Sequence, residues 1–496
     1  MDIQRAKEEI IRSVKAYLMK DELGEYLIPQ VHQRPILLIG PPGIGKTAIM
    51  EQAAKECGIS LLAYTITHHT RQSAVGLPFI EHREYDGREH AITEYTMSEI
   101  IASVHDRIRQ TGCREGILFI DEINCVSETL APTMLQFLQK KTFGSHPVPE
   151  GWIIAAAGNP PEYNKSVRDF DIVTLDRVRR IEVEESLPAW KKYAAEHHMH
   201  RAVLTYLELK PENFYRMETN VDGKRFVTAR GWEDLSRILY VYEKLGYTVD
   251  EGLTIQYLQH PGIARDFSNY YELFRRYAGD YGIEEVLAGQ ISREKICRLR
   301  EAPFDERISV VGLLLSALTR DLEHWDEIEQ YTDALYKEVK ALSRTPAAEQ
   351  LPALEERTRE LEAVLAMQRE NRLAREGDYR LRERLRRSLE EYQAIYRQGG
   401  SYELVKNAFL AAAEEQEAVT ELAGIHLERA FDFMGQAFGE SQEMVLFLTE
   451  LTILHAAIAY IREYGCKGYT EYIRLLQPNE EGREIREAIR SARMQE

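Results

Sequence analysis

The sequence has few cysteines, no long apolar run and no excess of basic residues. Its five cysteines are scattered and form no C-x-x-C pair, which argues against a disulfide or zinc framework and favours free thiols in a reducing cytosol. No segment approaches the roughly 20 apolar residues of a membrane-spanning helix. The N-terminal segment up to Leu27 lacks the apolar stretch of a signal peptide. We therefore expect a cytoplasmic protein without membrane insertion.

The charge balance is acidic. Lysine and arginine number 63 against 81 aspartate and glutamate residues, which gives a formal net charge of −18. This balance does not favour an extended basic face that would bind duplex DNA or an anionic membrane, although it does not exclude a local basic channel. With 496 residues, 44% of them hydrophobic, the chain is long enough for two to four domains.

Residues 1–184 alternate short apolar runs with helical patterns. The runs RPILLIG, SLLAYTI, GILFIDE and GWIIAAAGN are each followed by a loop rich in glycine, proline, asparagine or aspartate. This pattern is typical of a parallel sheet that is buried on both faces, with crossover helices between its strands. An Asp-Gly pair within FIEHREYDGREHAITEY predicts a β-hairpin at about residues 79–95. The fold class that we expect is α/β.

Beyond Leu187 the strand signals fade. PAWKKYAAEHHMHRAVLTYLEL, ARGWEDLSRILYVYEKLG and DEGLTIQYLQ read as amphipathic helices, and we assign residues 185–262 to a small helical domain. Residues 263–496 form a large all-α region. Within it, leucine and other apolar residues recur at spacings of three, four or seven between Ile328 and Tyr392, which predicts a helical hairpin at about 320–397.

A phosphate-binding loop follows the strand ILLI and precedes the helix AIMEQAAKE. The sequence Gly40-Pro-Pro-Gly-Ile-Gly-Lys-Thr47 matches G-x-x-x-x-G-K-[ST] in the context that the motif requires. Its glycines let backbone N–H groups surround phosphate oxygens, and the helix N-terminus adds its dipole. We expect Lys46 to reach the β- and γ-phosphates of ATP and Thr47 to ligate Mg²⁺. The predicted nucleotide-binding residues are Gly40, Pro41, Pro42, Gly43, Ile44, Gly45, Lys46, Thr47 and Ala48.

Two acidic residues end a second buried strand in ILFIDEIN. Asp121 lies at the carboxyl end of this strand, where open α/β sheets bind ligands, and we expect it to join Thr47 in the Mg²⁺ site. Glu122 is placed to polarise an attacking water.

Asn159 ends the next strand, in AAAGNPPEYN. Such a side chain, next to the Asp121 strand, can orient the attacking water or contact the γ-phosphate. The alternative is that Asn159 only forms the turn before Pro160.

Taken together, GPPGIGKT, LFIDEIN, AGNPPEYN and TLDRVRRI resemble the AAA+ ATPases over roughly residues 1–260, and more narrowly the MoxR-like branch related to magnesium chelatase and dynein AAA domains. The resemblance implies a five-stranded αβα core, a helical lid, and a ring, commonly hexameric, with ATP at subunit interfaces. It implies that Asn159 is the sensor-one residue, that Arg177 is an arginine finger, and that Arg230 in VTARGWEDL is the sensor-two arginine. Arg179 and Arg180 remain alternatives for the finger.

The branch commonly works with a von Willebrand factor A-domain partner and remodels or matures target proteins. Our first hypothesis is therefore a ring-forming ATPase that acts on a protein client in a chaperone-like way. The alternatives are a nucleic-acid motor or loader, which the acidic charge does not favour, and a nucleotide-switched scaffold with slow hydrolysis. The helical half beyond residue 263 has no counterpart in the resemblance.

Overall fold

The computed structural model describes residues 1–66, 76–85, 88–143, 146–163, 170, 172–220, 223–290, 292–371 and 376–476. The chain divides into two compact units. The sheet unit comprises Met1–Tyr193, Glu212–Ile238 and Gly252–Ile263, and the helical unit comprises Ala194–Pro211, Leu239–Glu251 and Ala264–Glu496. Parts of residues 185–262 fall in both units, and the three domains expected from the sequence remain a prediction.

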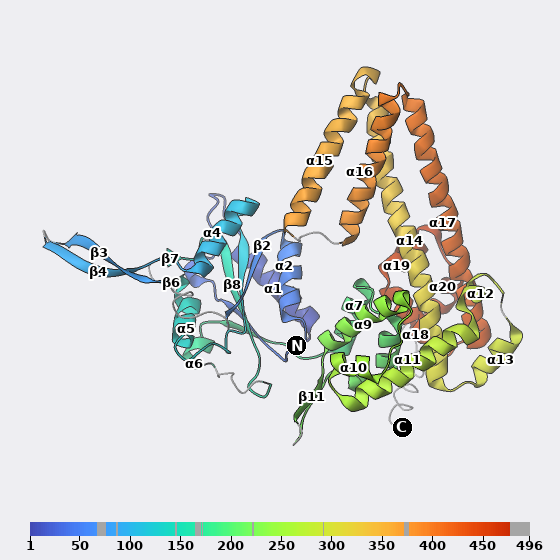
Figure 1. The fold of residues 1–496 in the computed structure, drawn as a ribbon, viewed down its shortest axis with the longest axis horizontal. Helices are drawn as coiled ribbons and strands as arrows, with labels where there is room; N and C mark the ends of the chain where they lie inside the picture. The colour runs from blue at the N-terminus through green and yellow to red at the C-terminus, as the bar shows by residue number, and fades with distance from the viewer. Residues whose placement is uncertain are drawn as a thin grey trace. The chain divides into compact units, whose positions relative to one another are not determined.

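A five-stranded parallel sheet forms the centre of the sheet unit (Figure 1). Its strands lie in the order β2-β5-β8-β1-β9, so that β5 has β8 as a neighbour and β1 lies between β8 and β9. This confirms the parallel α/β sheet that the apolar runs predict. The strands are β1 (Ile36–Ile39), β2 (Ser60–Thr65), β5 (Gly116–Asp121), β8 (Trp152–Gly158) and β9 (Arg179–Glu182).

Helices cover both faces of this sheet because successive strand residues point to opposite sides. In β1, Ile36 and Leu38 pack with α1 and α2 in one buried cluster, whereas Leu37 packs with α4 and α5 in another. The helices are α1 (Ile3–Tyr17), α2 (Lys46–Cys57), α4 (Glu99–Thr111), α5 (Ala131–Lys140) and the short α6 (Ile172–Leu175), with a 3₁₀ turn, η1, at Gln30–His32.

Three antiparallel hairpins extend the sheet unit: β3 (Pro78–Tyr85) with β4 (Arg88–Tyr95), β6 (Thr142–Phe143) with β7 (His146–Pro147), and β10 (Arg216–Asn220) with β11 (Gly223–Val227). The first confirms the predicted hairpin, although its Asp-Gly turn lies outside the described residues. The second lies in KTFGSHPVPEG. The third was not predicted, although the pair Asp222-Gly223 is a hairpin signal in the sequence.

The segment Pro188–Leu209 is not one helix, and our reading of it was wrong in this respect. It forms α7 (Leu187–Glu196) and α8 (Arg201–Leu209), with a break at the histidines between them. His198 has a left-handed backbone with φ of 51°, which ends helical geometry. The His200 ring then accepts a hydrogen bond from the Ala202 N–H at 3.2 Å and caps α8. A 3₁₀ turn, η3 (Pro211–Asn213), α9 (Ala229–Leu245) and α10 (Glu251–Leu258) follow.

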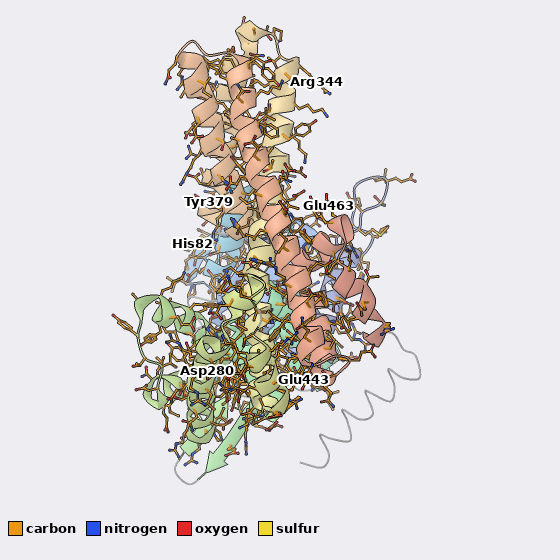
Figure 2. All side chains as sticks on the ribbon, turned by 90° about the vertical axis from the view of Figure 1, so that its right-hand side faces the viewer. His82, Asp280, Arg344, Tyr379, Glu443 and Glu463 are labelled. Carbon is orange, nitrogen blue, oxygen red and sulfur yellow. The ribbon has the colours of Figure 1, made fainter. Side chains whose placement is uncertain are left out.

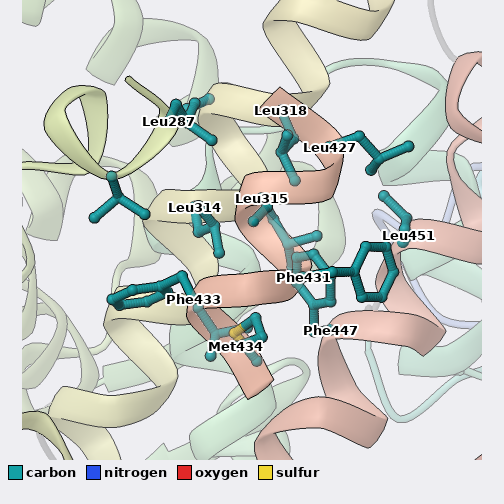
Figure 3. Packing of buried hydrophobic residues seen from close by; sticks show 14 of the residues in the cluster. Leu287, Leu314, Leu315, Leu318, Leu427, Phe431, Phe433, Met434, Phe447 and Leu451 are labelled. Carbon is teal, nitrogen blue, oxygen red and sulfur yellow. The ribbon is translucent and has the colours of Figure 1, made fainter. Parts of the chain in front are cut away.

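The helical unit has its main core between α14, α17 and the helices near them (Figure 3). Leu314 and Leu318 of α14 pack with Leu427 and Phe431 of α17 and with Phe447 of α18. Its helices after α8 are α11 (Pro261–Tyr281), α12 (Ile283–Leu287), α13 (Arg293–Glu301), α14 (Phe304–Arg344), α15 (Gln350–Asn371), α16 (Glu376–Arg397), α17 (Tyr402–Ala437), α18 (Gln442–Ile453), α19 (His455–Tyr464) and α20 (Lys467–Tyr472), with 3₁₀ turns η4 (Ala347–Glu349) and η5 (Ile473–Leu476).

A second cluster joins α14, α15, α16 and α17 towards the end of the bundle that Arg344 marks, away from Glu443 (Figure 2). The predicted apolar positions Tyr331, Leu335, Leu354 and Leu385 are buried in it. The helical hairpin expected at 320–397 is thus part of a larger arrangement, because α17 packs on α14. Within the described residues no single helix could span a membrane, and only α18 and α19, bent by 91°, meet the length and composition criteria together.

Candidate nucleotide site

The loop between β1 and α2 adopts the backbone that its glycines allow. Gly43 and Gly45 have φ of 75° and 94°, values that side chains rarely permit. Gly45 is the N-cap of α2, so the helix begins at Lys46 with its N-terminal N–H groups directed at the loop. Thr228, just before α9, lies so close to Gly43 that a Cβ there would be 2.9 Å from its side chain.

Lys46 is buried beneath this loop. Its ammonium donates hydrogen bonds to the Gly40 and Pro41 carbonyls, both at 2.8 Å, and to the Asn159 side-chain oxygen at 2.9 Å. Burial disfavours the charged form and lowers its pKa to about 8, although the Asp121 carboxylate acts in the opposite direction. The phosphate loop and the end of β8 therefore meet at a single ammonium group.

Thr47 and Asp121 converge from α2 and β5. The Thr47 hydroxyl donates to the Asp121 carboxylate at 2.9 Å. A hydroxyl and a carboxylate are oxygen ligands of the kind that Mg²⁺ prefers, and Mg²⁺ usually takes its other ligands from water and phosphate. The donor set therefore fits the predicted ion. Among the described residues, no group of three His, Cys, Asp or Glu side chains forms another candidate metal site.

Glu122 lies in a tight turn at the end of β5. Its φ of 56° is in the left-handed region, which costs a non-glycine residue roughly 1–3 kcal/mol and is common at active sites. Three contacts hold the turn: the Glu122 N–H donates to Asp121 at 2.9 Å, Ile123 donates to the Ala157 carbonyl at 2.9 Å, and Cys125 donates to the Glu122 carbonyl at 2.9 Å.

Asn159 is held by a residue that we did not assign a role from the sequence. The Asn124 side chain donates to the Asn159 carbonyl at 2.7 Å and accepts from the Asn159 N–H at 3.3 Å. Asn124 is buried and lies within the quoted motif ILFIDEIN. The sequence shows Asn124 three residues after Asp121, which is a signal for a role near the site. Its pairing with the residue after β8 follows only from the order of strands in the sheet.

Arg230 is the second residue of α9 and lies beside the phosphate loop, where its N–H donates to the Gly43 carbonyl at 3.2 Å. Its charge is close enough to contribute to the lowered pKa of Lys46. The Tyr215 hydroxyl also donates to the Pro42 carbonyl at 2.9 Å. Tyr215 and Arg230 are thus fixed to the loop by hydrogen bonds to its carbonyl groups.

A cavity of about 330 Å³ opens next to the loop, within the sheet unit. Ile3, Ile44, Trp190 and Phe214 supply apolar surface. The loop residues Gly43, Gly45 and Thr47, the start of α9 at Ala229 and Arg230, and the charged side chains Glu233, Asp234 and Arg237 line it as well. An apolar slot that leads to a phosphate loop suits a nucleoside.

The three arginines of TLDRVRRI have different surroundings. Arg179 pairs with Glu9 of α1 at 2.5 Å, and Arg180 pairs with Glu182. Arg177 is exposed and donates to the neutral side chain of Gln139. Within the described part of the chain, no hydrogen bond or ion pair joins Arg177 to the phosphate loop. The fold therefore brings together Lys46, Thr47, Asp121 and Asn159, and leaves Arg177 apart.

Comparison with known proteins matches residues 36–176 to the family described as "ATPase family associated with various cellular activities (AAA)". A search of curated proteins found no match. Among solved structures, the chain is similar to a "putative ATPase" of Cytophaga hutchinsonii, at 18% sequence identity and a TM-score of 0.21, over 37% of this chain and 51% of that one. The chain thus spans about half the length of that protein.

The family match runs from the start of β1 to the residue before Arg177, and it includes Lys46, Asp121, Glu122 and Asn159. Its extent agrees with the hydrogen bonds of Lys46 with Asn159 and of Thr47 with Asp121 at one edge of the parallel sheet. Residues 36–176 form an ATPase domain of the AAA family.

Proposed function

We propose that the chain is a MoxR-like AAA+ protein that hydrolyses ATP with Mg²⁺ and, as a ring, remodels or matures a protein partner. The observation that carries the ATPase part is the convergence of Lys46, Thr47, Asp121 and Asn159 through hydrogen bonds of 2.8–2.9 Å at the carboxyl ends of neighbouring strands. Phosphoryl transfer to water needs side chains that hold the metal ion, the phosphate and the attacking water close to one another.

Each side chain has a role that matches its chemistry. Lys46 binds phosphate oxygens and offsets their charge, and Glu122 accepts a proton from the attacking water. Asn159 orients that water or contacts the γ-phosphate. Thr47 and Asp121 would hold Mg²⁺, which neutralises charge on the phosphates when it is bound.

The cavity beside the loop supports binding of the nucleoside end of ATP. Ile44 and Trp190 provide apolar surface for a base, and Arg230 lies where the loop and the cavity meet. An arginine at this place suits a sensor-two role, in which it contacts phosphate and couples the lid to the state of the nucleotide.

A ring explains the position of Arg177. Arg179 and Arg180 already pair with carboxylates of their own chain, whereas Arg177 has a neutral partner and can exchange it at little cost. We propose that Arg177 contacts the γ-phosphate bound by a neighbouring subunit. A trans-acting arginine of this kind is worth roughly 10³–10⁵ in rate.

The partner side of the proposal rests on the MoxR-like resemblance, which suggests a protein client and a von Willebrand factor A-domain partner. The acidic net charge of −18 argues against a nucleic-acid motor. A pull-down with Glu122→Gln, which should bind ATP without hydrolysing it, would capture a client that binds the ATP state.

The test of the ATPase proposal is phosphate release by the wild type and Glu122→Gln, with Mg²⁺ present or chelated. We expect hydrolysis by the wild type alone, only with Mg²⁺, and with a specific activity that rises with protein concentration as the ring assembles. Equal rates in the two proteins would refute the role of Glu122, and an activity independent of concentration would refute the shared site.

A further inference from the structure

The backbone of Asn159 is fixed by one side chain. Its N–H and its carbonyl both pair with the Asn124 amide, at 3.3 and 2.7 Å, and its own side chain accepts from Lys46 at 2.9 Å. Regular pairing of β5 with β8 ends at Ile120 and Ala156. The Asn124 amide therefore continues the ladder beyond the strands and imitates a peptide group, because it offers one donor and one acceptor side by side.

Gly158 makes this pairing possible. A Cβ on Gly158 would lie 2.6 Å from the Asn124 Oδ1 atom, 2.8 Å from its Cγ and 3.0 Å from its Nδ2, and these are its three nearest neighbours. The φ of Gly158 is not in the left-handed region. The need for glycine at this position thus comes from the Asn124 side chain and not from the backbone conformation.

We infer that Asn124 is a positioning residue for the ATPase reaction: it holds Asn159 within hydrogen-bond distance of Lys46, with Gly158 leaving the space that it requires. The inference rests on the proposed function. Asn124 contacts the backbone of Asn159 and affects the reaction through the position of that residue. Without the Asn124 amide, the segment after β8 is free to shift, and a displacement of about 1 Å at a positioned group can cost on the order of 10²-fold in rate.

The geometry predicts a specific coupling between two substitutions. Asn124→Ala removes both hydrogen bonds, and Gly158→Ala should expel the Asn124 side chain and so lose the same bonds. In the double variant the new methyl group enters the space that Asn124 has left. The two changes should therefore not add, whereas independent sites add within narrow limits.

The experiment compares the wild type, Asn124→Ala, Gly158→Ala and the double variant by denaturant unfolding and by steady-state ATP hydrolysis. We expect kcat to fall on the order of 10²-fold in each single variant, with a much smaller change in KM, and the double variant to match the Asn124→Ala protein in both stability and kcat. Unfolding is measured without nucleotide, so it reports the coupling independently of activity.

Additive losses in stability or in kcat would overturn the inference, as would a wild-type kcat in Asn124→Ala. If Asn124→Ala fails to fold, Gly158→Ala alone decides: an unchanged kcat in that variant would contradict the account. Absence of hydrolysis in the wild type would overturn the proposed function and this inference together, whereas normal kcat in the variants of an active enzyme would overturn the inference alone.

Discussion

Replacing Lys46 by methionine should separate nucleotide binding from stability. Burial lowers the pKa of this lysine from 10.5 to about 8. Since one pKa unit corresponds to about 1.4 kcal/mol, charging it in the folded chain costs about 3 kcal/mol relative to the unfolded chain. Methionine has a similar length and no charge. The loss of three hydrogen bonds, to the Gly40 and Pro41 carbonyls and to the Asn159 side chain, offsets about 1 kcal/mol each.

The two effects nearly cancel, so the nucleotide-free Lys46→Met protein should differ from the wild type by less than about 1 kcal/mol in stability. Nucleotide binding should change much more than stability. Hydrogen bonds to charged groups contribute about 1.5–3 kcal/mol, so the loss of the ammonium should weaken ATP binding by about 10- to 100-fold.

Denaturant unfolding without nucleotide and titration with a fluorescent ATP analogue measure the two effects. Lys55→Met is the matched control, because Lys55 is an exposed lysine of the same helix, and it should change neither quantity by much. A Lys46→Met protein that is less stable than the wild type by 2 kcal/mol or more, on the order of two lost hydrogen bonds, would refute the reasoning. Unchanged nucleotide affinity would refute the role of Lys46.

Three further predictions concern single residues. Thr47→Val should abolish the tightening of ATP binding by Mg²⁺, and equal Mg²⁺ dependence in variant and wild type would exclude Thr47 as a ligand. Arg177→Ala should lower hydrolysis about 10³-fold or more without changing ATP affinity, whereas Arg180→Ala, the matched control, should hydrolyse ATP at close to the wild-type rate. Burial lowers the pKa of Lys141 from 10.5 to about 8. Between these pH values the lysine binds more protons in the unfolded chain than in the folded chain, so the free energy of unfolding should rise with pH. Lys141→Met should lose that part of the rise, and an equal pH dependence of unfolding in variant and wild type would contradict the prediction.

Much of the fold was predictable because its signals are local. Buried parallel strands are continuous apolar runs, and GPPGIGKT sets the boundary between β1 and α2 by its glycines alone. The pairing of Asp121 with Thr47 also follows, since Asp121 ends β5 and Thr47 lies in the first turn of the helix that follows β1, at the same edge of the sheet.

Other features depend on contacts between distant segments. Asn124 looks like an ordinary turn residue until β5 and β8 are placed side by side, and the requirement for Gly158 appears only with it. The cavity takes residues from α1, the phosphate loop, α7 and α9, which no periodicity connects. The helix break at His198 depends on a single left-handed residue, which amphipathic spacing across Pro188–Leu209 conceals.

The central claim is that a neighbouring copy of the chain supplies Arg177 to the ATP site, and mixing two inactive variants tests it most directly. Glu122→Gln retains Arg177 but cannot activate water, and Arg177→Ala retains Glu122 but lacks the arginine. In a mixed ring some sites combine Glu122 of one subunit with Arg177 of the next. We predict that ATP hydrolysis reappears on mixing, whereas a mixture as inactive as its separate components would contradict the account.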